Sequence, residues 1–185
     1  MKDIQKIMQE LIDNVIRESK KKAFKSEEEI QGYFSGNLRY LLADNFEFIR
    51  EFPTSENYKR AKDGILFKNA KGKHGFIDLV IKKDDFPFIG IELEYPRGEG
   101  LKNIQNFSSH LKNDILKLNN EPTFTFRYLF VFLYNDPPFD YRGAIYGLKF
   151  DNIHFAYIRL HRRDELEGEK TVKESIIIPD NWLKV

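Results

Sequence analysis

The chain of 185 residues contains no cysteine and no long hydrophobic run. Without cysteine, disulfides, cysteine-ligated zinc and thiol catalysis are excluded, and a reducing compartment is the consistent setting. No apolar stretch approaches the roughly 18 to 20 residues that a helix needs to cross a bilayer. The first residues, Met1 to Ile4, are typical of a helix start rather than of a signal peptide. We therefore expect a cytoplasmic protein with no membrane segment.

A surplus of charge of one sign is also missing, since the formal net charge is +1 at pH 7. The cations are nevertheless clustered, and such clusters can supply the phosphate contacts that dominate affinity for nucleic acid. A solvated surface explains the same pattern equally well. One cluster is Lys20, Lys21, Lys22 and Lys25, and a second is Lys59, Arg60, Lys62, Lys68, Lys71 and Lys73.

Apolar residues are plentiful, at 41% of the chain with 17 phenylalanines. This content suffices for one hydrophobic core and predicts a single domain over residues 1–185. Within it we expect an N-terminal helix in residues 1–24, a core in residues 26–134 and a C-terminal extension in residues 135–185.

Three segments have the apolar spacing of amphipathic helices, namely residues 2–22, 26–42 and 101–119. Ser26, with Glu29 three residues later, has the capping-box pattern and marks the start of the second helix. The predicted buried stripes are Ile4, Ile7, Met8, Leu11, Ile12, Val15 and Ile16 in the first helix, Ile30, Phe34, Leu38, Leu41 and Leu42 in the second, and Leu101, Ile104, Phe107, Leu111, Ile115 and Leu118 in the third.

Strands are predicted between and after these helices. Residues 46–52 alternate apolar and polar side chains, and Pro53 is expected to end that strand. The lysine-rich residues that follow are expected to form a loop or an extended hairpin. The remaining predictions are a short strand at 65–67, a buried strand at 126–134, further elements at 144–148 and 153–160, and an edge strand at 175–178 with Trp182 packed on the core.

Three carboxylates lie inside two short apolar runs within residues 75–95. Side chains alternate along a strand, so Glu92 and Glu94 share one face. The link at residues 82–87 is short enough for a hairpin, which would place Asp78 beside both glutamates. Carboxylates buried without a partner are costly, so this set predicts one or two hard divalent cations. A solvated strand face is the alternative interpretation of the two glutamates.

The order of helix, three strands, helix and strand, with Asp78 followed 14 residues later by Glu92-Leu93-Glu94, resembles the PD-(D/E)xK nuclease superfamily. The resemblance covers residues 26–134. It implies an α+β (α/β) restriction-endonuclease-like fold, with an αβββαβ core, a central mixed sheet flanked by helices, and an extra N-terminal helix. The sequence departs from the family pattern at Glu94, where the family usually has lysine.

The resemblance implies metal-dependent hydrolysis of a phosphodiester bond, as in endonucleases of the restriction, defence or repair type. Mg²⁺ or Mn²⁺ would be held by Asp78, Glu92 and the carbonyl of Leu93, with Glu94 as general base. In such folds a lysine from elsewhere can replace the missing motif lysine. On the third helix Lys112 lies beside the buried stripe, whereas helical phase places Lys117 on the far side, so Lys112 is the preferred candidate.

A further acid often comes from the first core helix of this superfamily. Among Glu27, Glu28 and Glu29 we choose Glu29, because its helical phase puts it at the edge of the apolar face, while Glu28 points outward. The alternative for Glu29 is a purely structural capping box. The four histidines lack ligand spacing, so pairing or solvent exposure is expected for His74, His110, His154 and His161.

Three alternatives stay open at this point. The implied partner is nucleic acid, and DNA by analogy with the family, but the domain could instead be a nuclease-like fold without catalysis that binds nucleic acid or a protein. An unrelated α+β binding protein would use the same acids in salt bridges with lysines. A homodimer is also open, with the N-terminal helix as one contact, although its stripe is more typical of packing within the chain.

Overall fold

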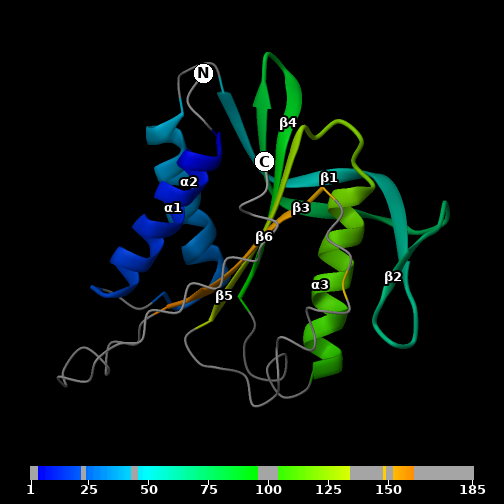
Figure 1. Ribbon diagram of the computed structural model, residues 1–185. Helices are drawn as coiled ribbons and strands as arrows, with labels where there is room; N and C mark the ends of the chain where they lie inside the picture. The colour runs from blue at the N-terminus through cyan, green and yellow to red at the C-terminus, as the bar shows by residue number, and fades with distance from the viewer. Residues whose placement is uncertain are drawn as a thin grey trace.

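Three helices flank a six-stranded sheet in the computed structural model of the protein (Figure 1). The structure describes residues 4–21, 24–42, 46–95, 104–133, 148 and 152–160. Most of the element expected at 144–148, and the tail strand with Trp182, lie outside the described residues. No helix in the described ranges is long and apolar enough to span a membrane.

The two N-terminal helices form as the sequence predicts. Helix α1 spans Ile4–Ser19, and its predicted apolar stripe is buried from Ile4 to Ile16. Helix α2 spans Glu27–Leu41 and is capped by Ser26, whose hydroxyl oxygen accepts the Glu29 N–H at 3.1 Å. The cap satisfies one of the N–H groups that have no partner inside a helix, and this explains why α2 begins there.

The sheet is mixed, with strand order β2-β1-β3-β4-β5-β6. The pairs from β2 to β4 are antiparallel, whereas β4–β5 and β5–β6 are parallel. Helix α3, Ile104–Asn119, makes the crossover between the parallel strands β4 and β5. The predicted α+β class with a mixed sheet flanked by helices is therefore confirmed. The strands are β1 Phe46–Arg60, β2 Leu66–Lys68, β3 Lys73–Lys83, β4 Phe86–Glu94, β5 Phe126–Leu133 and β6 His154–Arg159.

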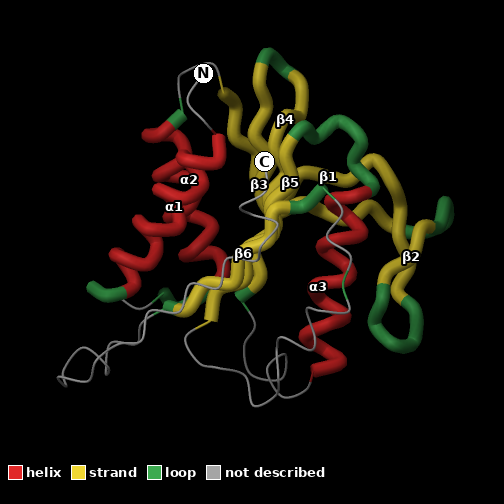
Figure 2. Tube along the Cα trace, in the orientation of Figure 1, coloured by secondary structure: helices red, strands yellow, loops and turns green. Residues whose placement is uncertain are grey.

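The helices divide between the two faces of the sheet, with α1 and α2 on one side and α3 on the other (Figure 2). Phe34 of α2 illustrates the first layer, since its ring centroid lies 5.3 Å from that of Phe130 and 6.1 Å from that of Phe132. Leu111 of α3 belongs to the second layer, together with Val131. Each face therefore has its own hydrophobic core.

Strand β1 is longer than predicted, because Pro53 does not end it. Pro53 pairs with Phe76 of β3, and the register shifts between Pro53 and Asn57. On its other side β1 pairs with β2 only from Tyr58 to Arg60, so Pro53 lies where β1 is an edge strand and a missing N–H is tolerated. The extended hairpin expected after Pro53 is present, since β1 pairs antiparallel with β2, and β3 adds a third strand. We call this three-stranded extension the arm and define it as residues 57–76.

Strand β3 changes face at Asp78. Ile77 packs with the core under α3, whereas Leu79 packs with the core under α1 and α2. Two residues that are two positions apart would share a face in a regular strand. The neighbouring strand β1 is also irregular here, since Glu51, between the residues paired with Leu79 and Ile77, has a φ of 52°. These two irregularities lie opposite each other in β3 and β1, between the arm and the rest of the sheet, and Asp78 is the β3 residue at this position.

Candidate functional site

Asp78 fills a gap where β3 and β4 part. The β3–β4 ladder reaches the pair Leu79 and Ile91 on the Asp78 side. One of the Asp78 carboxylate oxygens, Oδ2, then accepts the backbone N–H of Leu93 at 2.7 Å. The side chain thus replaces a backbone acceptor at the point of divergence, which holds its carboxylate at the end of the ladder.

Glu92 and Glu94 point toward α3. Their neighbours in β4, Ile91 and Leu93, belong to the core under α1 and α2, so the alternating glutamates face the opposite side. Glu92 is only 1% exposed. Gly90 shares their face, and a Cβ there would lie 2.3 Å from the ring of Phe124, so only glycine allows this packing.

Lys117 of α3 is the cation that reaches these acids. Its Nζ lies 2.6 Å from Oε1 of Glu92 and 3.0 Å from Oδ1 of Asp114, and it donates a hydrogen bond to the Phe76 carbonyl at 3.0 Å. Oε1 of Glu92 has no aligned hydrogen-bond donor among the described residues, so the contact with Lys117 is a close ion pair with poor alignment. The ammonium group therefore hydrogen-bonds to the Phe76 carbonyl and forms ion pairs with two carboxylates.

The preference for Lys112 over Lys117 is therefore wrong. Lys112 is exposed, whereas the side chain of Lys117 is 13% exposed. The apolar stripe identifies the side of α3 that packs on the sheet. The arm covers a second side of α3 through polar contacts, since Asn113 Oδ1 accepts the Leu66 N–H at 2.7 Å. Lys117 lies between these two sides, and phase relative to apolar residues alone could not reveal this.

The α2 acid whose pKa responds to the strand carboxylates is Glu27, whereas Glu29 takes the capping-box role that was its alternative interpretation. Glu29 closes the capping box, since its Oε2 accepts the Lys25 N–H at 2.7 Å. Burial, together with the negative charges of Asp78 and Glu94, raises the pKa of Glu27 to about 7. Glu27 therefore lies within the electrostatic range of the strand carboxylates.

His110 adds a second basic group to the site. Its Nδ1 lies 3.4 Å from Oε1 of Glu94. This hydrogen-bonded contact raises the pKa of His110, while burial raises the pKa of Glu94. The expectation that the histidines pair or are exposed holds for His110, which does both.

Burial raises the pKa values of the strand acids. The pKa of Asp78 rises to about 6, although the N–H of Leu93 opposes the rise. The pKa of Glu92 lies well above its usual value because the side chain is buried, and the Lys117 ammonium offsets only part of this effect. Perturbed carboxyl groups that share a site are typical of functional centres, although structural ion pairs also produce them.

The kinds of donor fit a hard divalent cation, since the five neighbouring acids offer only carboxylate oxygens. Among the described residues, the basic side chains in contact with these acids are Lys117 and His110. Within the described ranges, however, no three His, Cys, Asp or Glu side chains form a group that could hold a metal as they stand. The Lys117 ammonium supplies the positive charge beside Glu92 and Asp114. The acids are Glu27, Asp78, Glu92, Glu94 and Asp114.

Asp114, His110 and Lys117 lie on α3, and sequence reasoning did not assign the first two to the site; Lys117 and Glu27 were considered but ranked below Lys112 and Glu29. On α3 the first three recur at spacings of four and three residues, which indicates a polar stripe beside the apolar one. That second stripe was the available signal. A scan against protein-family models finds no match for this chain, and searches of curated proteins and of solved structures find none either.

Proposed function

We propose that this protein is a metal-dependent nuclease that hydrolyses phosphodiester bonds in DNA and has a restriction-endonuclease-like core. The order of elements supports the proposal, because α2, three antiparallel strands, α3 and the parallel strand β5 follow one another as in that core. Mg²⁺ or Mn²⁺ is the proposed cofactor, and a homodimer stays a prediction.

The observation that carries the proposal is the meeting of Asp78, Glu92 and Lys117 where β3 and β4 part. Asp78 accepts the Leu93 N–H, and Lys117 lies 2.6 Å from Glu92. The family pattern has lysine at the position of Glu94, and Lys117 brings an ammonium group to the same carboxylates from α3. Lys117 would therefore supply, from a different element, the positive charge that the family pattern places at the position of Glu94.

In the proposed mechanism Asp78, Glu92 and the Leu93 carbonyl hold the divalent cation. When bound, the cation would polarise the phosphate and lower the pKa of an attacking water. Lys117 neutralises negative charge beside the reacting phosphate. Glu94 takes the proton from water, a role that suits a carboxylate whose pKa burial has raised toward neutrality.

A second candidate function is binding without catalysis, by the same fold. The ion pair between Lys117 and Glu92 favours it, because these two side chains already offset each other's charge without a metal. In this case the acids and Lys117 form a structural network, as in the salt-bridged binding protein considered above. The two functions differ in whether added metal displaces Lys117 from Glu92.

A cleavage assay separates the two functions. Supercoiled plasmid and single-stranded DNA are incubated with the protein and Mg²⁺ or Mn²⁺, with EDTA as the blank. The nuclease proposal expects metal-dependent cleavage that falls by at least about 100-fold in Asp78→Asn, in line with the loss of a catalytic metal ligand. Asp85→Asn is the matched control, because Asp85 is an exposed turn residue, and it is expected to cleave like the wild type.

Absence of cleavage with either metal, in a protein that is folded and binds DNA, would overturn the nuclease proposal in favour of the second candidate. Equal cleavage by the wild type and Asp78→Asn would assign the activity to another site or to a contaminant.

A further inference from the structure

The arm carries a dense positive charge. Residues 57–76 contain a single acidic residue, Asp63, whose Oδ1 accepts the backbone N–H of Ile65. Among the arm's cations, Lys68 forms an ion pair with Glu56 at 3.2 Å. The arm's basic side chains are Lys59, Arg60, Lys62, Lys68, Lys71 and Lys73, and all are exposed. The arm is therefore a local cationic surface on a chain of nearly balanced charge.

Polar contacts hold the arm against α3. Asn113, which is 7% exposed, accepts the Leu66 N–H and donates to the Gly64 carbonyl at 3.2 Å. Nearer the base of the arm, the Asn120 side chain donates to the Tyr58 hydroxyl at 3.3 Å. Because α3 also carries Lys117, the arm has a fixed position relative to the carboxylate site.

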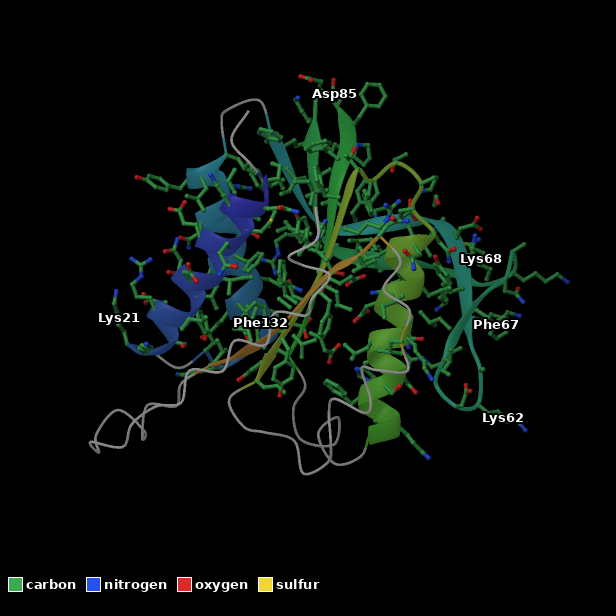
Figure 3. The ribbon with its side chains drawn as sticks, viewed as in Figure 1. Lys21, Lys62, Phe67, Lys68, Asp85 and Phe132 are labelled. Carbon is green, nitrogen blue, oxygen red and sulfur yellow. The ribbon has the colours of Figure 1, made fainter. Side chains whose placement is uncertain are left out.

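The other face of the arm is open. Tyr58 faces α3, and a Cβ on Gly75 would lie 3.3 Å from the Lys117 side chain. The alternating residues Lys59 and Phe76 therefore point away from α3. Phe67 pairs with Lys59 across the strands and shares its face. Figure 3 shows Phe67, Lys68 and Lys62 on the outer part of the arm.

Two large apolar rings are exposed on this face, where Lys59 also lies. Phe67 is 44% exposed and Phe76 is 48% exposed. Aromatic rings among cations are the combination by which proteins bind single-stranded nucleic acid, because every base can stack and every phosphate can pair with a cation. A duplex keeps its base faces stacked inside, so an exposed ring would add little to duplex binding.

We infer that the outer face of the arm binds an unpaired nucleic-acid strand, with bases stacked on Phe67 and Phe76 and phosphates contacted by Lys59 and neighbouring lysines. The inference rests on the proposed function in one respect, since it makes that strand the substrate of the carboxylate site. Binding itself needs neither metal nor catalysis.

The test is fluorescence anisotropy in EDTA, with a labelled DNA strand of about 20 nucleotides, longer than the usual site of a small binding domain. The same strand annealed to its complement is the duplex probe. We expect the single strand to bind more tightly than the duplex. Phe67→Ala should weaken single-strand binding by roughly 5- to 100-fold, the range for losing one stacked base.

Two controls make the result specific. Phe86→Ala removes another exposed phenylalanine, which is 75% exposed at the far turn between β3 and β4, and should bind like the wild type. Phe67→Trp keeps an aromatic ring and should retain affinity. Lys59→Gln should lower the salt dependence of single-strand binding by about 0.7 in the slope of log K against log salt, the value for one lost phosphate contact.

Equal or tighter binding of duplex, or wild-type affinity in Phe67→Ala, would overturn the inference. Failure of the proposed function gives a different pattern: the single strand binds as expected, yet no metal supports cleavage. Conversely, cleavage of single strands that is unchanged in Phe67→Ala would keep the nuclease and remove the arm from its substrate site.

Discussion

The two faces of the sheet are built on different principles. Beneath α1 and α2 the sheet meets rings and aliphatic chains, such as the Phe34, Phe130 and Phe132 group. Beneath α3 an apolar core gives way, at the end of β4, to buried Glu92 and its partner Lys117. An apolar face stabilises the fold directly, whereas buried charges cost desolvation and repay it only in good geometry. The α3 face therefore retains buried charge at a cost in stability, and it is the face that carries the proposed site.

The largest expected effect breaks the apolar face. Phe34→Ala removes a fully buried ring and should lower the free energy of unfolding by about 3 to 5 kcal/mol. Denaturant unfolding followed by circular dichroism measures the change. Tyr40→Ala on the same helix is the control, because Tyr40 is 89% exposed, and it should change stability by no more than about 0.5 kcal/mol. Equal effects of the two substitutions would contradict the packing described for α2.

On the charged face, Lys117→Met should lower the free energy of unfolding by about 3 kcal/mol at pH 8, because it leaves Glu92 buried without a cation. The loss should shrink near pH 5, where Glu92 can take up a proton. Adding Glu92→Gln in the double variant should recover much of the stability at pH 8. A loss of the same size at both pH values, with no recovery, would show that Lys117 acts through packing alone.

The raised pKa of Glu27 predicts a smaller, pH-dependent effect. Its folded-state pKa is about 7, against 4.5 for the free group, so the folded state binds the proton more tightly. Stability should therefore fall as pH rises from about 5 to 8, and Glu27→Gln should remove part of that fall. We expect the variant to be about 1 kcal/mol more stable at pH 8, since solvent screening reduces the effect.

The matched control is Glu29→Gln, which can keep the capping box and should leave the pH profile unchanged. A profile for Glu27→Gln that coincides with that of the wild type would place Glu27 outside the carboxylate cluster.

The smallest effects concern the turns, which belong to neither face. Asp85 has a φ of 66° in the two-residue turn between β3 and β4, where glycine is favoured. Asp85→Gly should raise stability by about 0.5 kcal/mol, and Gly64→Ala, at a φ of 83°, should lower it by about 1 kcal/mol. Thermal unfolding of both variants checks the signs, and the same sign in both would contradict the assigned backbone geometry.

Local patterns predicted the elements whose stability comes from apolar burial. The stripe of α1 and the cap at Ser26 were readable because helical period and capping are local properties. The turn at Asp84 and Asp85 was equally local. The common face of Glu92 and Glu94 followed from strand alternation alone.

Features that depend on contacts between distant residues could not be predicted. A proline often ends a strand. β1 continues past Pro53 because β2 pairs with β1 only from Tyr58 to Arg60 and leaves Pro53 on an unpaired edge. The assignment of Lys117 depended on the arm covering a polar side of α3 through Asn113. Glu27 entered the site because the start of α2 lies near the strand acids, and helical phase contains no information about that distance.

The central proposal is that the charged face binds a divalent cation through Asp78, Glu92 and the Leu93 carbonyl. Calorimetric titration of Mn²⁺ into the wild type and into Glu92→Gln, at pH 8 and so above the pKa of about 6 for Asp78, tests it most directly. The account predicts saturable binding in the wild type and its loss, or weakening by about 10- to 100-fold, in the variant. Equal heats in the two proteins, or no binding at millimolar Mn²⁺, would contradict it and leave Lys117 as the permanent partner of Glu92.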